Sequence, residues 1–408
     1  MPGPDGESAL RALLTPEGRR LLERLPAYDP DSALGVGAAL RREGLDESLV
    51  ATAMTQARLR ARGRVKFGDL AARLLFTEDG LQQATRPPVA ALHAGRFTAA
   101  GTGAVLDLCC GIGGDLIAMA SAGLRVVGVD RDPLTCAVAE ANIAELGLAE
   151  RATVRCADVA EMDLVGAEAV FVDPARRTGR GRTFDPRAYS PPFDAVLEMA
   201  RAVPATGAKV APGIPHGALP AGAEAEWVSD GGDVLECGLW FGPLGDPLAA
   251  RRATLLPAGA TVTGDGMRRA PVGPVGRWLH EPDGAVIRAG LVAEVAEQIG
   301  AVLLDPTIAY LTTTEPVATP FATSYEVTDV LPFSLKRLRT LLRSRGVGSL
   351  TVKKRGTAVQ PEALRRQLRL SGDAEATIVL TRVAGEHTVL VVHPLRDPQA
   401  SHARTTTT

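Results

Sequence analysis

One stretch decides the fold predicted for this chain: Val105-Leu-Asp-Leu-Cys-Cys-Gly-Ile-Gly-Gly-Asp115, which is followed by Val126-Val-Gly-Val-Asp130. The two runs predict a buried strand, a glycine turn, a helix and a second buried strand that ends in an acid. Glycines in the turn let the backbone approach a ligand closely, because a Cβ atom there would clash. Asp130 would lie at the carboxyl end of its strand, where a ribose diol needs an acceptor. The pattern predicts a nucleoside site.

The residues around the turn separate two nucleoside cofactors. A dinucleotide fingerprint needs Gly-x-Gly-x-x-Gly or Ala, whereas Gly111-Ile-Gly-Gly-Asp-Leu116 has leucine at the third position. Asp107 lies four residues before the first glycine, and a pyrophosphate would be repelled by carboxylates so close to it. A cationic methionine moiety would be attracted by the same carboxylates. The residues therefore favour S-adenosylmethionine over NAD.

Residues 104–173 resemble a class I S-adenosylmethionine-dependent methyltransferase. The segment from Asp107 to Gly113 is similar to the first motif of that family, although Cys109 stands where a glycine is common. The resemblance implies a Rossmann-like parallel sheet flanked by helices, with S-adenosylmethionine as the cofactor.

Three acids further along the chain match other positions of the family. Asp130 matches the ribose-binding acid, Asp158 the acid that contacts the adenine amino group, and Asp173 the catalytic or substrate-facing position after the fourth strand. The role expected of Asp173 is to hold an acceptor amine or oxygen, or to take its proton. The residues expected to bind the cofactor are Asp107, Cys109, Gly111, Gly113, Asp130, Arg131 and Asp158.

The composition allows two to three domains in 408 residues, and an apolar content of 46% is enough for a sizeable core. No run of eighteen apolar residues and no apolar leader is present, which predicts a cytoplasmic protein without a membrane partner. The five cysteines lack paired spacing, so no metal site is expected. Cys237 lies in a strand-like run without an activating motif, and we expect it to pack in the core rather than to act as a nucleophile.

Local patterns divide the chain into five segments. Residues 1–95 are expected to be helical, and residues 96–250 to alternate strands and helices as the methyltransferase domain. Residues 251–330 are expected to be a bridging segment, residues 331–395 a small basic domain, and residues 396–408 a disordered tail.

The second segment is expected to hold five parallel strands and a hairpin. No helix pattern separates the two strands of the hairpin, so it should form one edge of the sheet. The strands are expected near residues 104–108, 125–129, 153–156, 169–172 and 208–211, and the hairpin near 225–228 and 234–241.

The run Phe76-Thr-Glu-Asp-Gly-Leu-Gln-Gln-Ala-Thr85 predicts a threonine-capped short helix before the glycine turn. It resembles a phrase found in relatives of trimethylguanosine synthase, where it closes over the cofactor. A helix that merely packs on the domain stays open as the alternative.

An arginine-rich loop follows Asp173. Methyltransferases that act on exocyclic base amines tend to have a second proline and then an aromatic ring there, but this chain has alanine and arginine. A stacking ring would have to come from Phe184, Tyr189 or Phe193. Guanidinium forks match phosphate oxygens, so the loop suits a polyanionic substrate. The arginines expected to bind it are Arg176, Arg177, Arg180 and Arg182.

Residues 331–370 contain eleven lysines and arginines and one acid, Glu362. The pattern predicts a helix, a strand that ends in a basic turn, a second helix and a hairpin. This block resembles the THUMP-like domain that follows some methyltransferases, which implies a structured RNA partner such as tRNA or rRNA. The expected contacts in the basic turn are Lys353, Lys354 and Arg355.

The fold class predicted is therefore α/β: a Rossmann-like class I methyltransferase sheet with an N-terminal helical region and a small α+β THUMP-like C-terminal domain. The expected function is methyl transfer from S-adenosylmethionine to structured RNA. Two alternatives stay open. One is a methyltransferase for a protein or a small anionic metabolite, whose carboxylate or phosphate the arginine loop would clamp. The other is a non-catalytic RNA-binding protein that retains the cofactor site.

Overall fold

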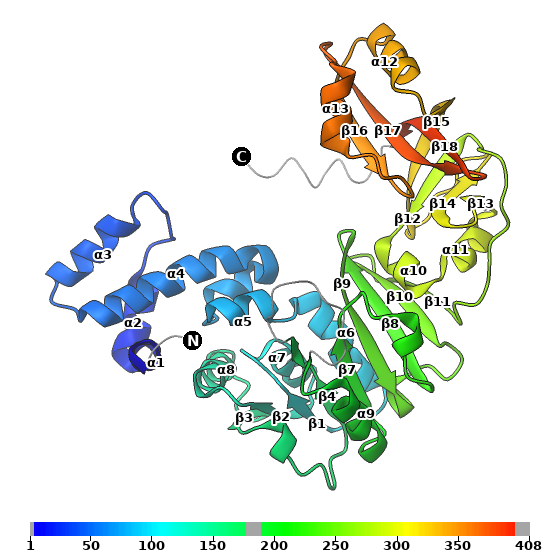
Figure 1. Cartoon of the computed structure of the whole chain (residues 1–408). Coiled ribbons are helices and arrows are strands. Elements are labelled where there is room, and N and C mark those ends of the chain that lie inside the picture. Colours follow the sequence, from blue (N-terminus) through cyan, green and yellow to red (C-terminus); the bar gives the residue numbers. More distant parts are fainter. Residues whose placement is uncertain (1–3, 177–188, 396–408) are drawn as a thin grey trace. The chain divides into compact units, whose positions relative to one another are not determined.

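The computed structural model describes residues 4–176 and 189–395 (Figure 1). The chain divides into two compact units, Met1–Glu224 with Cys237–Asp246, and Ala225–Glu236 with Pro247–Thr408. The division falls within the hairpin of β8 (Ala223–Asp230) and β9 (Asp233–Phe241). The glycine turn and its acids belong to the first unit, and the basic tail belongs to the second.

The N-terminal part of the first unit is helical, as the sequence predicts. Its longest helix, α4, begins after Asp46, whose carboxylate accepts a hydrogen bond from the Leu49 amide at 2.8 Å. The helices bury an apolar core that includes Leu59 and Phe76. They are α1 (Pro4–Leu13), α2 (Pro16–Arg24), α3 (Ala33–Arg42), α4 (Glu47–Phe67), the 3-10 helix η1 (Gly68–Ala72), α5 (Glu78–Gln83) and α6 (Pro87–Ala99).

The helix α5 has the predicted threonine cap, since the Thr77 hydroxyl accepts a hydrogen bond from the Gly80 amide at 2.9 Å.

The rest of the first unit alternates strands with helices. The elements are β1 (Ala104–Leu108), α7 (Gly114–Ser121), β2 (Arg125–Asp130), α8 (Pro133–Glu145), β3 (Ala152–Cys156), β4 (Val170–Val172), β5 (Ala175–Arg176), β6 (Tyr189–Ser190), α9 (Phe193–Ala202) and β7 (Thr206–Val210), besides the short 3-10 helices η2 (Val159–Glu161), η4 (His216–Ala218) and η5 (Gly242–Leu244).

The sheet of this unit is parallel over β7, β4, β1, β2 and β3, which lie in that order. The strands after β1 first extend the sheet through β2 and β3, and β4 then pairs on the other side of β1. The reversal creates a switch point between β1 and β4, where the crevice at the carboxyl ends of the strands takes ligands. Asp107 on β1 and Asp173 after β4 lie at this point.

The antiparallel strand β9 pairs with β7 and brings a large ring onto the sheet. Gly207 lies opposite Trp240, and a Cβ atom on Gly207 would come within 2.6 Å of the Trp240 ring. Trp240 also stacks with Phe171, with the ring centroids 6.3 Å apart. A glycine in β7 thus allows the largest residue type to pack flat on the core.

The hairpin is present, but the prediction that it forms one edge of the sheet is wrong. Arg251 of β10 lies opposite Ala225 of β8 in parallel register, and β11 then pairs with β10. The long strand β8 leaves a row of backbone donors and acceptors on its second side. The strand β10 satisfies them and buries Ala253 and Leu255 there.

The second unit holds a seven-stranded sheet in the order β13-β14-β12-β15-β18-β17-β16. Its strands come both from the expected bridging segment and from the basic tail, and β15 pairs with β12 on one side and with β18 on the other. The predicted helix–strand–helix–hairpin block is confirmed by α12, β16, α13 and the β17–β18 pair. The elements are β10 (Arg251–Leu256), β11 (Ala260–Gly264), β12 (Trp278–Pro282), α10 (Gly284–Ala289), α11 (Val292–Ile299), β13 (Val302–Asp305), β14 (Ile308–Thr313), β15 (Ala322–Pro332), α12 (Leu335–Ser344), β16 (Val347–Lys354), α13 (Pro361–Leu368), β17 (Ala374–Val383) and β18 (Glu386–Pro394).

Candidate active site

The glycine turn holds three residues in the left-handed region of backbone space. Cys109 has a φ of 62°, Gly111 of 57° and Gly113 of 93°. The first of these is unfavourable for a residue with a side chain, which explains why a glycine is common at this position in the family that the sequence resembles. Gly113 directly precedes α7, so the turn connects β1 to the helix within a few residues.

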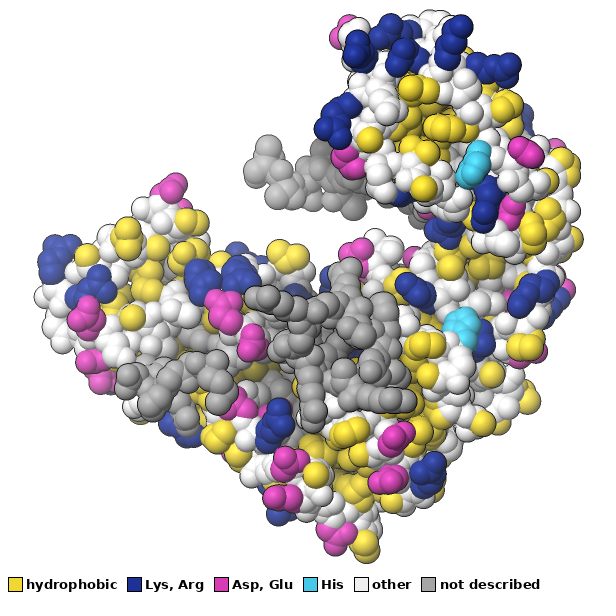
Figure 2. All heavy atoms as spheres, viewed as in Figure 1, with side chains coloured by type: hydrophobic (Ala, Val, Ile, Leu, Met, Phe, Trp, Pro, Cys, Tyr) yellow, Lys and Arg dark blue, Asp and Glu magenta, His cyan; other side chains and the backbone are white. Residues whose placement is uncertain are grey.

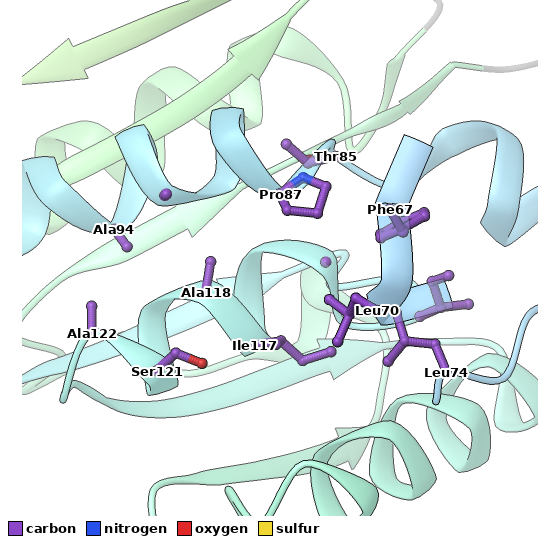
Figure 3. A pocket seen from close by; sticks show the side chains of 13 residues that line it. Phe67, Leu70, Leu74, Thr85, Pro87, Ala94, Ile117, Ala118, Ser121 and Ala122 are labelled. Atoms are coloured by element: carbon purple, nitrogen blue, oxygen red, sulfur yellow. The ribbon is translucent and has the colours of Figure 1, made fainter. Parts of the chain in front are cut away.

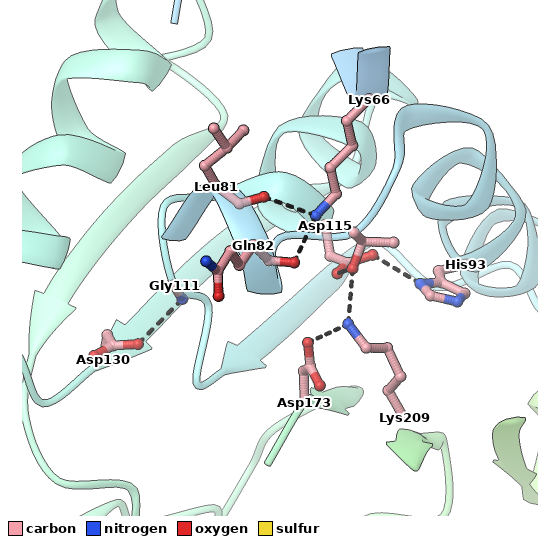
Figure 4. Close-up of polar contacts among 10 residues, drawn as sticks. Lys66, Leu81, Gln82, His93, Gly111, Asp115, Asp130, Asp173 and Lys209 are labelled. Atoms are coloured by element: carbon pink, nitrogen blue, oxygen red, sulfur yellow. Dashed lines mark hydrogen bonds and ion pairs between the residues drawn. The ribbon is translucent and has the colours of Figure 1, made fainter. Parts of the chain in front are cut away.

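Asp130 joins this turn to the end of β2 (Figure 4). Its Oδ2 accepts a hydrogen bond from the Gly111 amide at 3.1 Å, and its Oδ1 accepts one from the Asp132 amide at 3.0 Å. A carboxylate offers about four lone-pair sites, so acceptor capacity remains for a ligand. The structure therefore brings together Gly111 and Asp130, which the sequence predicts to share one site.

Asp107 is the most deeply buried of the predicted acids, with 1% of its surface exposed. Burial raises the pKa of its carboxyl well above the ordinary value, and the negative charges of Asp115 and Asp173 raise this pKa further. Its Oδ2 has no hydrogen-bond partner within the described residues. A buried polar atom without a partner is rare in folded proteins, and a ligand with a donor group would complete the hydrogen bonding of Asp107.

A hydrogen-bonded chain that the sequence did not predict connects Asp173 to α6 and α7 (Figure 4). Lys209 at the end of β7 donates one hydrogen bond to Asp173 and another to Thr85 Oγ1 at 3.0 Å. Thr85 Oγ1 donates to Asp115 Oδ2 at 2.5 Å, and the other oxygen of Asp115 lies 2.7 Å from His93 Nδ1.

The inner end of this chain is a buried contact between the Asp115 carboxyl and the His93 ring. Burial alone would raise the pKa of the Asp115 carboxyl, but the combined effects of His93, Lys209 and Thr85 outweigh burial and lower this pKa. The His93 ring lies against Phe171 and Trp240, with centroids 4.9 and 5.6 Å away. The packing against these two rings therefore restricts the position of the His93 ring.

Lys66 is a second lysine near this network. Its Nζ donates to the carbonyl oxygens of Leu81 and Gln82 at 2.9 and 3.0 Å, which ties the end of α4 to α5. Burial lowers the pKa of Lys66 to about 8, and the nearby charges of Lys209 and Arg86 contribute to this shift. Sequence spacing did not point to Lys66, because its role depends on the fold of residues 67–81.

The remaining predicted cofactor residues lie at the ends of β2 and β3. Arg131 directly follows β2 and is exposed. Asp158 is also exposed, and its Oδ1 accepts a hydrogen bond from the Ala160 amide at 2.9 Å. Since β2 and β3 are neighbours in the sheet, both residues lie at the same edge as Asp130.

The loop after Asp173 is described only at its two ends. Arg176 pairs with Tyr189 in the short β5–β6 ribbon, whereas Arg177, Arg180, Arg182 and Phe184 lie outside the described residues. The Tyr189 ring is buried, and its hydroxyl accepts a hydrogen bond from the Ala211 amide at 2.9 Å. Phe193 is buried as well. These two rings pack in the core and offer no stacking face.

An apolar cavity of about 390 Å³ lies among η1, α6 and α7 (Figure 3). Phe67, Leu70, Ile117 and Ala118 are among the residues that line it, and none of the predicted acids does. An apolar lining offers no partner for a charged cofactor. The acids at the carboxyl edge of the sheet, and not this cavity, mark the candidate site.

The predicted cations of the tail lie in the second unit. Lys353 donates to Glu281 Oε2 at 2.6 Å, and the Arg355 guanidinium lies 3.7 Å from Glu281 Oε1. Lys354 is exposed, and its Nζ lies 3.4 Å from Gln360 Oε1. Lys353 and Arg355 therefore face an acid, whereas Lys354 faces a neutral amide.

The described residues offer neither a metal-binding cluster nor a membrane-spanning helix. Within residues 4–176 and 189–395, no group of three or more His, Cys, Asp or Glu side chains is arranged to hold a metal ion. The same part of the chain contains no helix with the length and apolarity that crossing a bilayer requires.

Three protein-family models match the chain. A methyltransferase domain matches residues 105–172, a THUMP domain-like model matches residues 322–394, and a domain of unknown function matches residues 7–63. The first match covers the glycine turn and the strands that carry the acids. The second covers β15 to β18.

Individual proteins are similar over longer stretches. Uncharacterized S-adenosylmethionine-dependent methyltransferases of two Mycobacterium tuberculosis strains are 38% identical over 334 residues, which cover 80% of this chain and 90% of each relative. A crystal structure from Porphyromonas gingivalis W83, of a protein assigned to the methyltransferases, matches with a TM-score of 0.73 at 20% identity. This match covers 91% of the present chain and 100% of the other, and it bears on the fold alone.

Proposed function

This chain belongs to the family of S-adenosylmethionine-dependent methyltransferases, and from that premise we propose that it methylates structured RNA with Asp173 at the acceptor. The family relation also confirms the predicted cofactor and the predicted fold class. The observation that supports the site most directly is that Asp107, Asp130 and Asp173 lie on or directly after three adjacent strands, β1, β2 and β4, with Asp107 and Asp173 at the switch point.

The described residues fit the cofactor by two criteria. The buried Asp107 Oδ2 lacks a donor, and the ammonium group of a methionine moiety would supply one. The backbone at Gly111 and Gly113 leaves no side chain between the turn and a ligand. We assign the binding of the cofactor to Asp107, Cys109, Gly111, Gly113, Asp130, Arg131 and Asp158. When bound, S-adenosylmethionine supplies an electrophilic methyl group on a sulfonium.

The residues of the chain then have to align the acceptor and handle its proton. The Asp173 carboxylate is held by Lys209, so one of its oxygens has a fixed direction. A carboxylate has about four lone-pair sites, so Asp173 can also accept a hydrogen bond from an acceptor amine or hydroxyl, and can take the proton that leaves when the methyl group is transferred. Lys209 and Thr85 act as positioning residues in this scheme.

The distribution of charge along the chain supports RNA as the substrate. Residues 331–370 hold eleven cations and one acid, and the THUMP-like match covers this segment. We propose that Arg176, Arg177, Arg180 and Arg182 contact the phosphates of the substrate near the acceptor, because arginine forks match phosphate oxygens. The alternative substrates are a protein and a small anionic metabolite, which the same arginine loop would suit.

The test uses S-adenosylmethionine labelled on its methyl group, with RNA, DNA, protein and small-molecule fractions from a strain that lacks the gene. The proposal expects label in one size class of RNA, and no label with the Asp173→Asn variant. Label in protein or small molecules that the same variant abolishes would replace RNA by the alternative. No label in any fraction, with cofactor binding intact, would contradict methyl transfer and favour an RNA-binding protein without activity.

A further inference from the structure

The cations of the C-terminal segment fall into two sets with opposite surroundings. The first set is Lys353 and Arg355 at the end of β16, which both contact Glu281 of β12. Each also lies over a buried ring: the Lys353 ammonium is 5.3 Å from the centroid of Tyr325, and the Arg355 guanidinium is 5.1 Å from that of Tyr310.

These contacts occupy the groups that an RNA would use. The charge of Lys353 is balanced by an acid, and the rings of Tyr310 and Tyr325 are buried, so no base can stack on them. Both cations are half-buried. Releasing them would leave Glu281, with 20% of its side chain exposed, without its cations. The first set therefore stabilises the junction of β12, β14, β15 and β16.

The second set lies on α12 and α13. Lys336, Arg337, Arg366 and Arg369 are all exposed, and within the described residues their side chains make no hydrogen bond or ion pair. We call these four residues the helical basic face. Figure 2 shows Lys and Arg side chains gathered over this part of the second unit, where Figure 1 places α12 and α13.

Neighbouring arginines hold the two helices in fixed register beneath this face. Arg339 donates to the carbonyl oxygen of Gln367 at 2.6 Å, and Arg343 donates to that of Arg369 at 2.8 Å. Four leucines on the inward sides of the helices pack in one core: Leu338, Leu342, Leu364 and Leu368. The face is therefore a preformed surface and not a set of cations on mobile chain.

The chemistry of the helical basic face fits phosphates better than a lipid surface. A helix that lies on a membrane exposes an apolar side to the acyl chains. Here the leucines face the core, and none of the large exposed apolar side chains of the described part lies on α12 or α13. Clustered lysine and arginine heads with a single acid, Glu362, instead suit the evenly spaced charges of a nucleic-acid backbone.

We propose that the RNA partner binds the second unit through its phosphates at the helical basic face, and that Lys353 and Arg355 do not contact it. The inference rests on the proposed function, because it takes RNA as the partner. The place of contact is therefore the two helices and not the basic turn of Lys353, Lys354 and Arg355. Of these three residues, Lys354 alone is exposed.

The experiment uses the full chain and fluorescein-labelled bulk tRNA, with anisotropy titrations at 50, 100 and 200 mM KCl. The test variants are K336E/R337E and R366E/R369E. The matched control is R268E/R269E, which reverses two exposed arginines on another part of the same unit. Circular dichroism and thermal unfolding check that all variants fold.

Each helix variant should bind at least about tenfold more weakly at 100 mM salt, and its salt slope should fall by about 1.5, because each lost phosphate contact removes roughly 0.7–0.9 from that slope. The control should bind within about twofold of the unaltered chain, since it leaves those phosphate contacts in place.

Three outcomes would overturn the inference: helix variants that bind like the control, a control that loses affinity equally, or an unaltered chain that binds anionic phosphatidylglycerol vesicles but no tRNA. The methyl-label assay keeps the two proposals apart. If RNA takes up label but the helix variants bind tRNA normally, only the proposal of the helical basic face is contradicted. If RNA takes up no label, the proposed substrate is contradicted.

Discussion

Asp173 and Lys209 directly follow residues that lie opposite each other in neighbouring parallel strands, Val172 of β4 and Ala208 of β7. Lys209 donates a hydrogen bond to Asp173 across this register, although thirty-six residues separate them in the chain. Thr85 accepts a second hydrogen bond from the same ammonium at 3.0 Å. Lys209 is therefore held from two sides and sets the position of the Asp173 carboxylate.

Removing the ammonium of Lys209 should impair the methyl-transfer step more than cofactor binding. We expect Lys209→Met to lower kcat by about 10- to 100-fold, because a carboxylate displaced by an ångström loses alignment with the acceptor. Lys209→Arg should restore part of the rate. The measurement is kcat and KM with the RNA fraction that accepts label, beside calorimetric titration of S-adenosylmethionine. A Lys209→Met variant with unchanged kcat would rule out the positioning role.

Removing the carboxylate of Asp130 should weaken cofactor binding. Asp130→Ala loses the acceptor for the ribose and also releases the Gly111 amide. We expect Kd for S-adenosylmethionine to rise by about 10- to 100-fold, since hydrogen bonds to charged groups contribute roughly 1.5–3 kcal/mol. Asp163→Ala is the control, because Asp163 accepts a bond from the Val165 amide after β3 and lies outside the site. Equal affinities of the two variants would refute the assignment.

The lowered pKa of Lys66 makes one contribution to stability depend on pH. The folded chain has a pKa of about 8 at this position, against an ordinary value of 10.5. Between these values the unfolded chain binds more protons than the folded chain, so this contribution rises with pH. The urea midpoint of the unaltered chain, taken relative to that of Lys66→Met, should therefore increase from pH 8 to pH 10. A pH-independent difference would show that the ammonium of Lys66 is not perturbed by folding.

The Glu281 cluster should matter for the stability of the second unit. Glu281→Ala leaves Lys353 and Arg355 half-buried without their acid, and we expect a loss of about 1–3 kcal/mol in the free energy of unfolding. Urea unfolding measures this loss. Glu297→Ala is the matched control, since it breaks the exposed ion pair with Arg268 and should leave stability unchanged. Equal effects of the two substitutions would argue against a structural role for the cluster.

Gly207 should tolerate no side chain. A Cβ atom there would meet the Trp240 ring at 2.6 Å and Phe171 at 3.1 Å, so we expect Gly207→Ala to destabilise the first unit by about 1–3 kcal/mol. Gly217→Ala is the control, because a Cβ atom at Gly217 meets nothing within 4 Å. Thermal unfolding of both variants compares them. A neutral Gly207→Ala substitution would mean that the packing of Trp240 can shift.

Local patterns in the sequence predicted four of the five parallel strands closely, whereas β7 (Thr206–Val210) begins two residues before the expected 208–211. The expected strands at 104–108, 125–129, 153–156 and 169–172 match β1, β2, β3 and β4 within one residue at each end. Short runs rich in β-branched and other apolar residues between turns favour strands, and β1, β2 and β4 bury most of theirs. The edge of the sheet was predicted wrongly, because the pairing of β8 with β10 depends on which strand fills an open edge and not on local period.

The sequence by itself determined the α/β class, the glycine turn and the acids that end the strands, because these depend on short-range period and spacing. Only the tertiary structure decided that Lys209, Thr85 and His93 join the acids, since strand order and packing bring them together from distant segments. It also decided which cations face solvent. A run of lysines and arginines does not show which of them pair with an acid of the same chain. Lys353 pairs with Glu281, which lies about seventy residues earlier in the sequence.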